Sequence, residues 1–130
     1  MATWDDVSRI ALALPGTAES ETGHGTLQWR VRNKGFAWER PLGRADLAAL
    51  GDAAPQGPIL GACVSDLGER AGLLADDPDV YFIIPHYAGY PGILVRLERI
   101  PVSALKELLV EAWLVRAPKR LAKEYLEAQR

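Results

Sequence analysis

The sequence predicts an α+β fold in which a twisted antiparallel sheet is covered by one N-terminal helix and two C-terminal helices. Two observations support this class. Apolar residues recur at helical spacing at both ends of the chain, and short alternating runs separated by turn residues lie between them. With 130 residues, 48% hydrophobic and 25% charged, the chain has the size and balance of one globular domain. We therefore expect residues 1–130 to form a single domain, and we exclude a disordered, collagen-like or coiled-coil chain.

The first helix is expected over residues 4–14. Thr3 offers a side-chain cap for the free backbone N–H groups, and Asp5 and Asp6 complement the positive end of the helix dipole. The apolar residues of this segment share one face. Pro15 and the glycine after it then end the helix.

Two segments are expected to form a first hairpin. The polar stretch at residues 17–25 is predicted to be the loop that leads to it. Apolar and polar side chains alternate over residues 27–31, which predicts a strand with one wet face. A turn at residues 33–35 then leads to the partner strand at residues 36–39.

The middle of the chain is predicted to hold a short helix, a strand, a further helix and a second hairpin. In order, these elements are expected at residues 45–50, 59–64, 67–75, 80–84 and 93–97. The run at residues 80–84 is continuously apolar and either aromatic or β-branched, which predicts a central, buried strand.

Two helices are expected to close the chain. Ser103 opens the first, which ends near Arg116 because the residue before Pro118 avoids the helical region. Pro118 itself suits the first position of the last helix. The side chains expected to face inward from that helix are Leu121, Ala122 and Tyr125.

The cysteine and histidine counts exclude several kinds of site. The one cysteine, Cys63, rules out an intramolecular disulfide, and we expect it to be a small buried hydrophobe. One cysteine and two histidines do not make a zinc site, and the aspartates within residues 76–79 lack the spacing of a calcium loop. We find no glycine-rich phosphate loop, nucleophile elbow or carboxylate pair. We therefore expect no metal, no cofactor and no enzymatic activity.

Hydropathy and charge bear on location and partners. The chain has no secretory leader pattern and no apolar run of about 18 residues, so we expect a cytoplasmic protein without a membrane partner. A net charge of −2 and a pI near 5.7 are not those of a dedicated nucleic-acid-binding protein. The charge is uneven, however: residues 1–80 hold 12 acids and 7 bases, whereas residues 81–130 hold 5 acids and 8 bases.

Two groups of basic residues are candidates for contact with DNA phosphates. Arg30, Arg32 and Lys34 are expected on one exposed strand face and its turn. The second group, at the last two helices, consists of Arg116, Lys119, Arg120 and Lys123. Each group has an ordinary alternative, which is a solvated strand face for the first and surface pairs such as Arg120 with Glu124 for the second. Whether the two groups share a face decides between these interpretations.

The loop at residues 85–92 is the most distinctive local feature. Its His86, Tyr87 and Tyr90 suit a small-molecule site on a hairpin loop. The alternative is a rigid turn in which glycine and proline set the backbone and the rings cover the core.

Several motifs together resemble the MmcQ/YjbR family of small bacterial proteins, in the expected order and over nearly the whole chain. They are Ala13-Leu14-Pro15-Gly16-Thr17, Trp29-Arg-Val-Arg-Asn-Lys-Gly-Phe36-Ala37, Tyr81-Phe82 through Pro91, and Leu105-Lys-Glu-Leu-Leu with Ala112-Trp113. The chain departs from the family where His86-Tyr-Ala-Gly-Tyr-Pro replaces the Asn-Lys-x-x-Trp segment of many members. Any role of that lysine and tryptophan is therefore not carried over.

The resemblance implies a fold like that of the bacterial frataxin CyaY, and it implies the family's label of DNA-binding protein. On this basis we expect DNA binding with little sequence specificity through the two basic groups. The alternative is a non-catalytic adaptor or small-ligand-binding protein that uses the loop from His86 to Tyr90, with an unidentified protein or small-molecule partner. In either case we expect a monomer or a homodimer.

Overall fold

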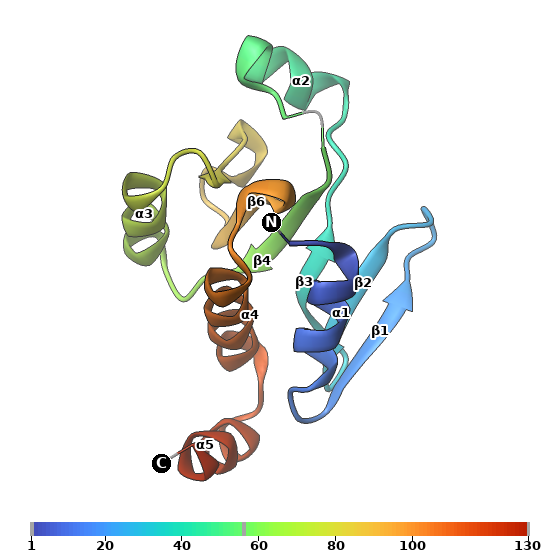
Figure 1. Cartoon of the computed structure of the whole chain (residues 1–130), viewed down its shortest axis with the longest axis vertical. Coiled ribbons are helices and arrows are strands. Elements are labelled where there is room, and N and C mark those ends of the chain that lie inside the picture. Colours follow the sequence, from blue (N-terminus) through green and yellow to red (C-terminus); the bar gives the residue numbers. More distant parts are fainter. Residues whose placement is uncertain (1, 56, 130) are drawn as a thin grey trace.

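A six-stranded antiparallel sheet forms the centre of the computed structural model, which describes residues 2–55 and 57–129 (Figure 1). In space the strands follow the order β1-β2-β3-β4-β6-β5, and every neighbouring pair is antiparallel. Their bounds are β1 Thr17–Glu21, β2 Leu27–Val31, β3 Lys34–Glu39, β4 Ile59–Cys63, β5 Tyr81–Phe82 and β6 Gly92–Arg96. The predicted α+β class with an antiparallel sheet is confirmed.

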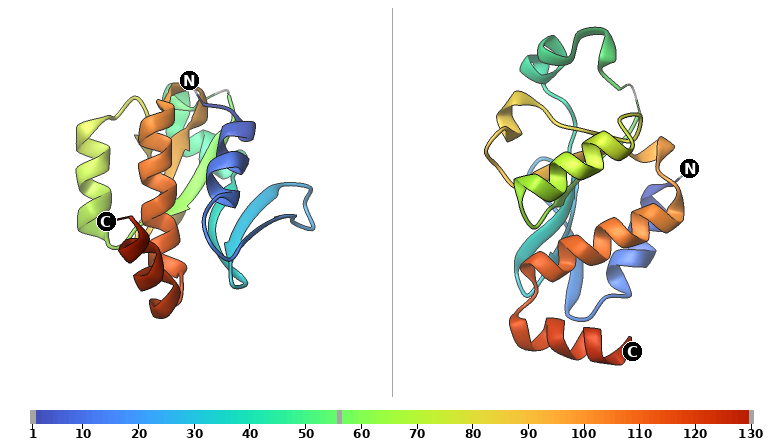
Figure 2. Two further views of the ribbon diagram at one scale, coloured as in Figure 1. Left: turned by 60° about the horizontal axis from the view of Figure 1, so that its bottom comes forward. Right: turned by 90° about the vertical axis from the view of Figure 1, so that its left-hand side faces the viewer.

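Most of the helices lie on one face of this sheet. Their bounds are α1 Trp4–Leu12, α2 Arg44–Leu50, α3 Leu67–Asp76, α4 Val102–Arg116 and α5 Lys119–Ala128. The long helix α4 packs on β3 and β4 with α1 beside it, α3 contacts β5, and α5 follows α4 at one end of the molecule (Figure 2). Helix α2 lies at the opposite end (Figure 1). Across the described residues, no helix is both long and apolar enough to cross a membrane.

Most predicted elements are present, with small shifts at their ends. The helix α2 and the strands β4 and β6 lie where the sequence predicts them, and the segment at residues 67–75 forms the complete helix α3. Helix α4 begins at Val102, one residue before the expected Ser103, and Pro101 is its N-cap. Pro118 separates α4 from α5, and no residue of α5 is fully buried.

The start of α1 is fixed by a capping box. The Thr3 hydroxyl accepts a hydrogen bond from the Asp6 amide at 3.3 Å, and the Asp6 carboxylate accepts one from the Thr3 amide at 2.9 Å. This bond from the Thr3 backbone and a second one from Arg9 hold the pKa of Asp6 below its ordinary value. The helix ends at Leu12, two residues before the predicted end.

The prediction of a loop over residues 17–25 is wrong, because Thr17–Glu21 forms the edge strand β1. Its residues are mostly exposed, so the segment lacks the apolar alternation that marks a strand. The strand is held by pairing with β2 and by side-chain hydrogen bonds: Trp29 Nε1 donates to the Glu19 carboxylate at 2.8 Å, and the Thr17 hydroxyl bonds to the carbonyl oxygens of Ala11 and Leu14.

The prediction of a central, buried strand over residues 80–84 is confirmed for the burial of the strand and for its pairing with β6, but its position and length are wrong. The strand β5 has two residues and lies at the other edge of the sheet, beside β6. The segment is apolar because side chains on both faces of the strand are buried. Tyr81 joins the core under the helices, whereas Phe82 joins a smaller cluster on the opposite face, where the Arg96 guanidinium lies 4.5 Å from its ring centroid.

The protein therefore has two hydrophobic clusters, one on each face of the sheet. The larger lies between the sheet and the helices, and its largest fully buried side chains include Trp29, Phe36, Leu60, Leu109 and Trp113. The smaller, on the opposite face, consists of Ile59, Phe82, Ile84, Tyr87 and Leu94, with Trp38, Leu42 and Leu50 packed against it. The loop at residues 85–92 and α2 supply part of its cover.

Gly61 in β4 lets the indole of Trp38 lie against the sheet. The two residues are paired across β3 and β4, and a Cβ atom on Gly61 would be 2.1 Å from Trp38 Nε1. The indole N–H instead donates to the hydroxyl of Tyr87 at 3.1 Å. Glycine at this position thus determines where the indole lies.

We predict that Gly61→Ala lowers the free energy of unfolding by about 1–3 kcal/mol, because the added methyl group displaces the Trp38 indole from a packed position. Gly72→Ala in α3 is the matched control, since nothing lies within 4 Å of its added Cβ atom. A glycine-to-alanine change within a helix is expected to stabilise by about 0.5–1 kcal/mol. Urea denaturation measures both effects, and a Gly61→Ala protein as stable as the wild type would contradict the close approach.

Candidate functional site

An open hollow of about 480 Å³ lies on the sheet face opposite α4. We call it the aromatic hollow, and its six lining residues are Gln28, Gly35, Trp38, His86, Tyr87 and Tyr90. The strands β2 and β3 supply the first three of these residues, and the loop at residues 85–92 supplies the others. Its size is within the range of about 300–1,000 Å³ that is usual for small-molecule sites.

The buried guanidinium of Arg70 holds the loop of the hollow in place. Arg70 lies in α3 and is 6% exposed. Its two terminal nitrogens donate to four carbonyl oxygens of the loop at 2.7–3.2 Å, those of Tyr87, Ala88, Tyr90 and Gly92. Among the described residues no carboxylate pairs with Arg70, so these four carbonyl dipoles stabilise its charge. The loop backbone is thereby fixed at four points.

Two tyrosines of the loop have different environments. Tyr87 is buried and accepts the Trp38 indole N–H, which confirms the interpretation of this residue as a ring that covers the core. Tyr90 is 39% exposed and packs edge-on against Tyr87, with ring centroids 5.4 Å apart. Trp38 lies 6.4 Å from Tyr90 on its other side, and His86 is exposed at the end of the loop. Tyr90 and His86 therefore remain free to contact a ligand.

The other wall of the hollow depends on Gly35. The Gln28 amide folds over this glycine, where an added Cβ atom would lie 2.6 Å from Gln28 Nε2. Gln28 Oε1 accepts a hydrogen bond from Arg30 Nη2 at 3.2 Å. The amide NH₂ group of Gln28 thus lines the hollow, and a guanidinium stands directly behind it.

A second guanidinium, that of Arg116, hydrogen-bonds to the side chain of the lining residue Tyr90. Arg116 Nε donates to Cys63 Sγ at 3.2 Å, and this bond, together with Tyr90, raises the pKa of Arg116. The Cys63 thiol in turn donates to the Gly35 carbonyl at 3.7 Å, so the predicted buried cysteine is confirmed. Burial first, and then the neighbouring Cys63, raises the pKa of Tyr90, whereas its hydrogen bond with Arg116 lowers it.

This arrangement suits recognition of a flat ring with negative charge. Three aromatic side chains present ring faces and edges, and Gln28 and His86 present polar groups. The six lining residues include no carboxylate, and two of them bond to arginines outside the lining: Gln28 to Arg30 and Tyr90 to Arg116. Over residues 2–55 and 57–129, no three His, Cys, Asp or Glu side chains come together as a metal site.

The strand register shows that the prediction of one basic strand face is wrong. The turn of the hairpin is formed by Arg32 and Asn33, both with positive φ, one residue earlier than expected. As a result, Lys34 lies opposite Val31, whose side chain is buried under the helices. Paired residues share a face, so Lys34 and Arg30 lie on opposite faces of the hairpin rather than on one.

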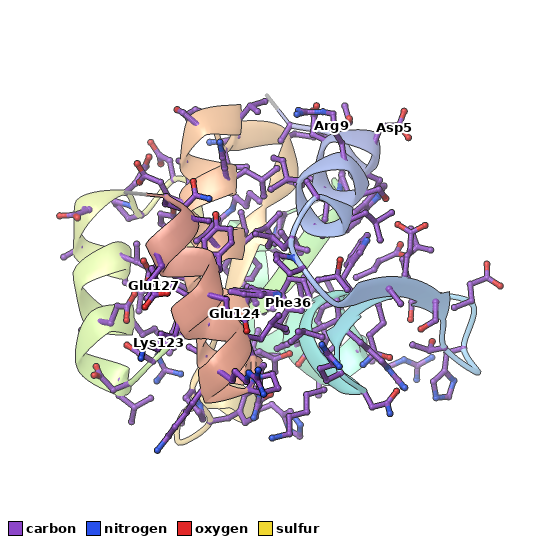
Figure 3. All side chains as sticks on the ribbon, turned by 90° about the horizontal axis from the view of Figure 1, so that it is seen from below. Asp5, Arg9, Phe36, Lys123, Glu124 and Glu127 are labelled. Carbon is purple, nitrogen blue, oxygen red and sulfur yellow. The ribbon has the colours of Figure 1, made fainter. Side chains whose placement is uncertain are left out.

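The second basic group is divided as well. Arg32 and Arg120 line a shared hollow of about 360 Å³, together with Glu124, which pairs with Arg120 at 3.4 Å as predicted. Arg116 instead turns toward Cys63. Figure 3 shows Lys123 on the side of α5 that faces α3, away from Glu124. The exposed Lys119 belongs to the first turn of α5. The seven basic residues therefore do not form one continuous face.

Four residues of the site were not identified from the sequence: Gln28, Gly35, Trp38 and Arg70. The alternation of the two strands gives a usable signal for Gln28 and Trp38, which pair directly on the outer face. Arg70 gives no signal, because an arginine in a short helix is normally exposed.

Comparison with known proteins identifies relatives of the chain. A model of the YjbR family matches residues 12–115, which include all six residues of the aromatic hollow. The Uncharacterized protein Mb2600 of Mycobacterium bovis and the Uncharacterized protein Rv2570 of Mycobacterium tuberculosis are each 52% identical to the chain over 129 residues, covering 97% of both chains. Among solved structures, the DUF419 protein DR2400 of Deinococcus radiodurans matches 95% of this chain and 88% of its own, with a TM-score of 0.69. At 21% identity, that similarity shows the fold alone.

We predict that Arg70→Met lowers the free energy of unfolding by about 2–4 kcal/mol, because it leaves buried carbonyl groups of the loop without donors. Amide hydrogen exchange should accelerate at residues 87–92 more than elsewhere. The exposed Arg99 provides the matched control, because Arg99→Met removes the same charge without touching the loop. Unchanged protection of residues 87–92 in Arg70→Met would contradict this role.

Proposed function

The chain belongs to the YjbR family, and we propose that it is a binding protein whose aromatic hollow takes a planar aromatic molecule with a negative charge. The observation that carries this proposal is that two of the lining residues, Gln28 and Tyr90, hydrogen-bond to the guanidinium groups of Arg30 and Arg116. The proposal keeps the small-ligand function expected for the loop from His86 to Tyr90, and it adds residues of the sheet to the site.

The shape of the hollow supports a planar ligand. Trp38 and Tyr90 lie 6.4 Å apart with their rings at 56°, and Tyr87 meets Tyr90 at 71°. A flat ring that enters contacts aromatic carbon on several sides, and each aromatic contact is worth about 0.5–1.5 kcal/mol beyond area burial. Because Tyr87 and Trp38 are already held by their hydrogen bond, little conformational entropy is lost on binding.

The charge of the ligand follows from the groups around the hollow. Arg30 donates to the Gln28 side-chain oxygen, and Arg116 hydrogen-bonds to the Tyr90 side chain. A carboxylate, sulfonate or phosphate on the ligand would meet the positive potential of these two guanidinium groups. A hydrogen bond to a charged group contributes about 1.5–3 kcal/mol, which favours an acid over its neutral counterpart.

We propose binding without chemical conversion, in the bacterial cytoplasm. The free thiol of Cys63 suits a reducing compartment. A ligand recovered unchanged after incubation with the protein supports this part of the proposal, and a converted product overturns it.

The binding proposal predicts that naphthalene-2-carboxylate and adenosine monophosphate bind more tightly than naphthalene-2-carboxamide and adenosine. Tyr90→Ala should weaken binding of the acids about 2- to 10-fold through the lost ring contact. Arg30→Ala should weaken it about tenfold, whereas binding of the neutral compounds should change little. Isothermal titration calorimetry with the full chain measures all of these affinities.

Two controls separate the hollow from general charge effects. Arg99→Ala removes one positive charge outside the hollow and should leave the affinities unchanged. Gly35→Ala displaces the Gln28 amide without removing any aromatic ring or charge, and should weaken binding. If neither acid binds at millimolar concentration, or if the neutral compounds bind equally well, the proposal fails.

A second candidate function, DNA binding with little sequence specificity, is favoured by one observation. Arg32 and Arg120 line one hollow although 88 residues of sequence separate them. Two phosphate contacts there predict a log–log salt slope of about −1.8 for duplex DNA. Fluorescence anisotropy with Arg32→Glu/Arg120→Glu should then show loss of binding. Absence of wild-type binding at low salt, where attraction is strongest, would remove this candidate.

A further inference from the structure

A groove of about 380 Å³ between α3 and α4 combines an apolar floor with an acidic rim. We call it the acidic groove. Leu73, Tyr81 and Leu108 are among its floor residues, and its carboxylates are Glu69, Glu107 and Glu111. It lies on the helical side of the sheet, whereas the aromatic hollow lies on the other side.

Arg116 lies beside the acidic groove, since it donates to Cys63 Sγ and Cys63 is one of the lining residues. Over residues 2–55 and 57–129, none of the three glutamates of the groove forms an ion pair. Burial first, and then Asp77 and Glu107, raises the pKa of Tyr81, whose phenol forms part of the floor. The groove therefore favours an occupant that brings apolar side chains together with positive charge.

Helix α5 carries this combination on its exposed surface. Lys119, Lys123 and Leu126 follow one another at spacings of four and three residues, which places them on one side of the helix. Leu126 is 50% exposed, although it is a large apolar residue. The three bases of α5 are Lys119, Arg120 and Lys123, and its two acids are Glu124 and Glu127. The bases outnumber the acids and come before them in the sequence.

The acidic groove and α5 lie on the same side of the molecule. Figure 2 shows α3, α4 and α5 together in front of the sheet. Figure 3 shows Lys123 and Glu127 on the side of α5 that faces α3. A twofold axis through this side brings α5 of each copy to the groove of the other, so both contacts form at once and the assembly closes.

We propose that two copies of this chain form a symmetric dimer in which α5 of each copy lies in the acidic groove of its partner. Leu126 is the apolar anchor on the groove floor, and Lys119 and Lys123 pair with the glutamates of the rim. The dimer leaves the aromatic hollow accessible and is independent of the proposed ligand.

The experiment is sedimentation velocity on the full chain at 10–200 µM and at low and high salt, a range chosen for about micromolar affinity. The wild type should form a dimer that dissociates as salt screens the charge pairs. Glu107→Lys/Glu111→Lys and Lys119→Glu/Lys123→Glu should each be monomeric, because each variant places like charges at both contacts. Their equimolar mixture should form a heterodimer, because both contacts then join opposite charges.

Two further variants control for folding and for general charge. Leu126→Asp changes an exposed residue, so the monomer should stay folded by circular dichroism while dimerisation weakens at least tenfold. Glu21→Lys/Asp52→Lys reverses two exposed acids away from the helices and should leave the dimer intact. The proposal is overturned by a wild type that is monomeric at 200 µM and low salt, by charge-reversed variants that remain dimeric, or by a mixture that stays monomeric.

Discussion

The four hydrogen bonds from Arg70 to the loop at residues 85–92 are the interaction on which the candidate site depends. A guanidinium presents several N–H donors in one rigid plane, so a single side chain satisfies several carbonyl groups that face one point. The same bonds offset the cost of burying the charge. Because they fix the backbone on both sides of Tyr87 and Tyr90, they fix the two rings as well. The exposed His86 then projects from a loop that is held in one conformation.

Two glycines set the opposite wall. Without a side chain on Gly61, the Trp38 indole approaches β4 and reaches the hydroxyl of Tyr87. Without one on Gly35, the Gln28 amide folds down beside the hollow. Aromatic and polar groups of the two strands therefore hold their positions before any ligand is present. Such pre-organisation allows a small open site to bind with useful affinity, because few groups must be ordered on binding.

The fold could be predicted from the sequence where local chemistry determined it. The cap at Thr3, the alternating strand β2 and the proline break before α5 all depend on neighbouring residues. The edge strand β1 could not be predicted in this way, because its polar side chains are mostly exposed. It is a strand because it pairs with β2. The prediction of one basic strand face was wrong because the turn lies one residue earlier than expected. This difference places Lys34 on the other side of the hairpin from Arg30. Arg70 could not be identified because its four partners lie 17 to 22 residues away in sequence.

The most direct test of the aromatic hollow follows the four tryptophan indole N–H signals by NMR during titration with naphthalene-2-carboxylate. Trp38 lines the hollow, whereas Trp29 and Trp113 are fully buried and donate to the Glu19 carboxylate and to the Pro15 carbonyl. Binding in the hollow predicts that the Trp38 signal shifts with saturation while the other three stay in place. A titration that leaves Trp38 unmoved, or that shifts the other tryptophans instead, would contradict it.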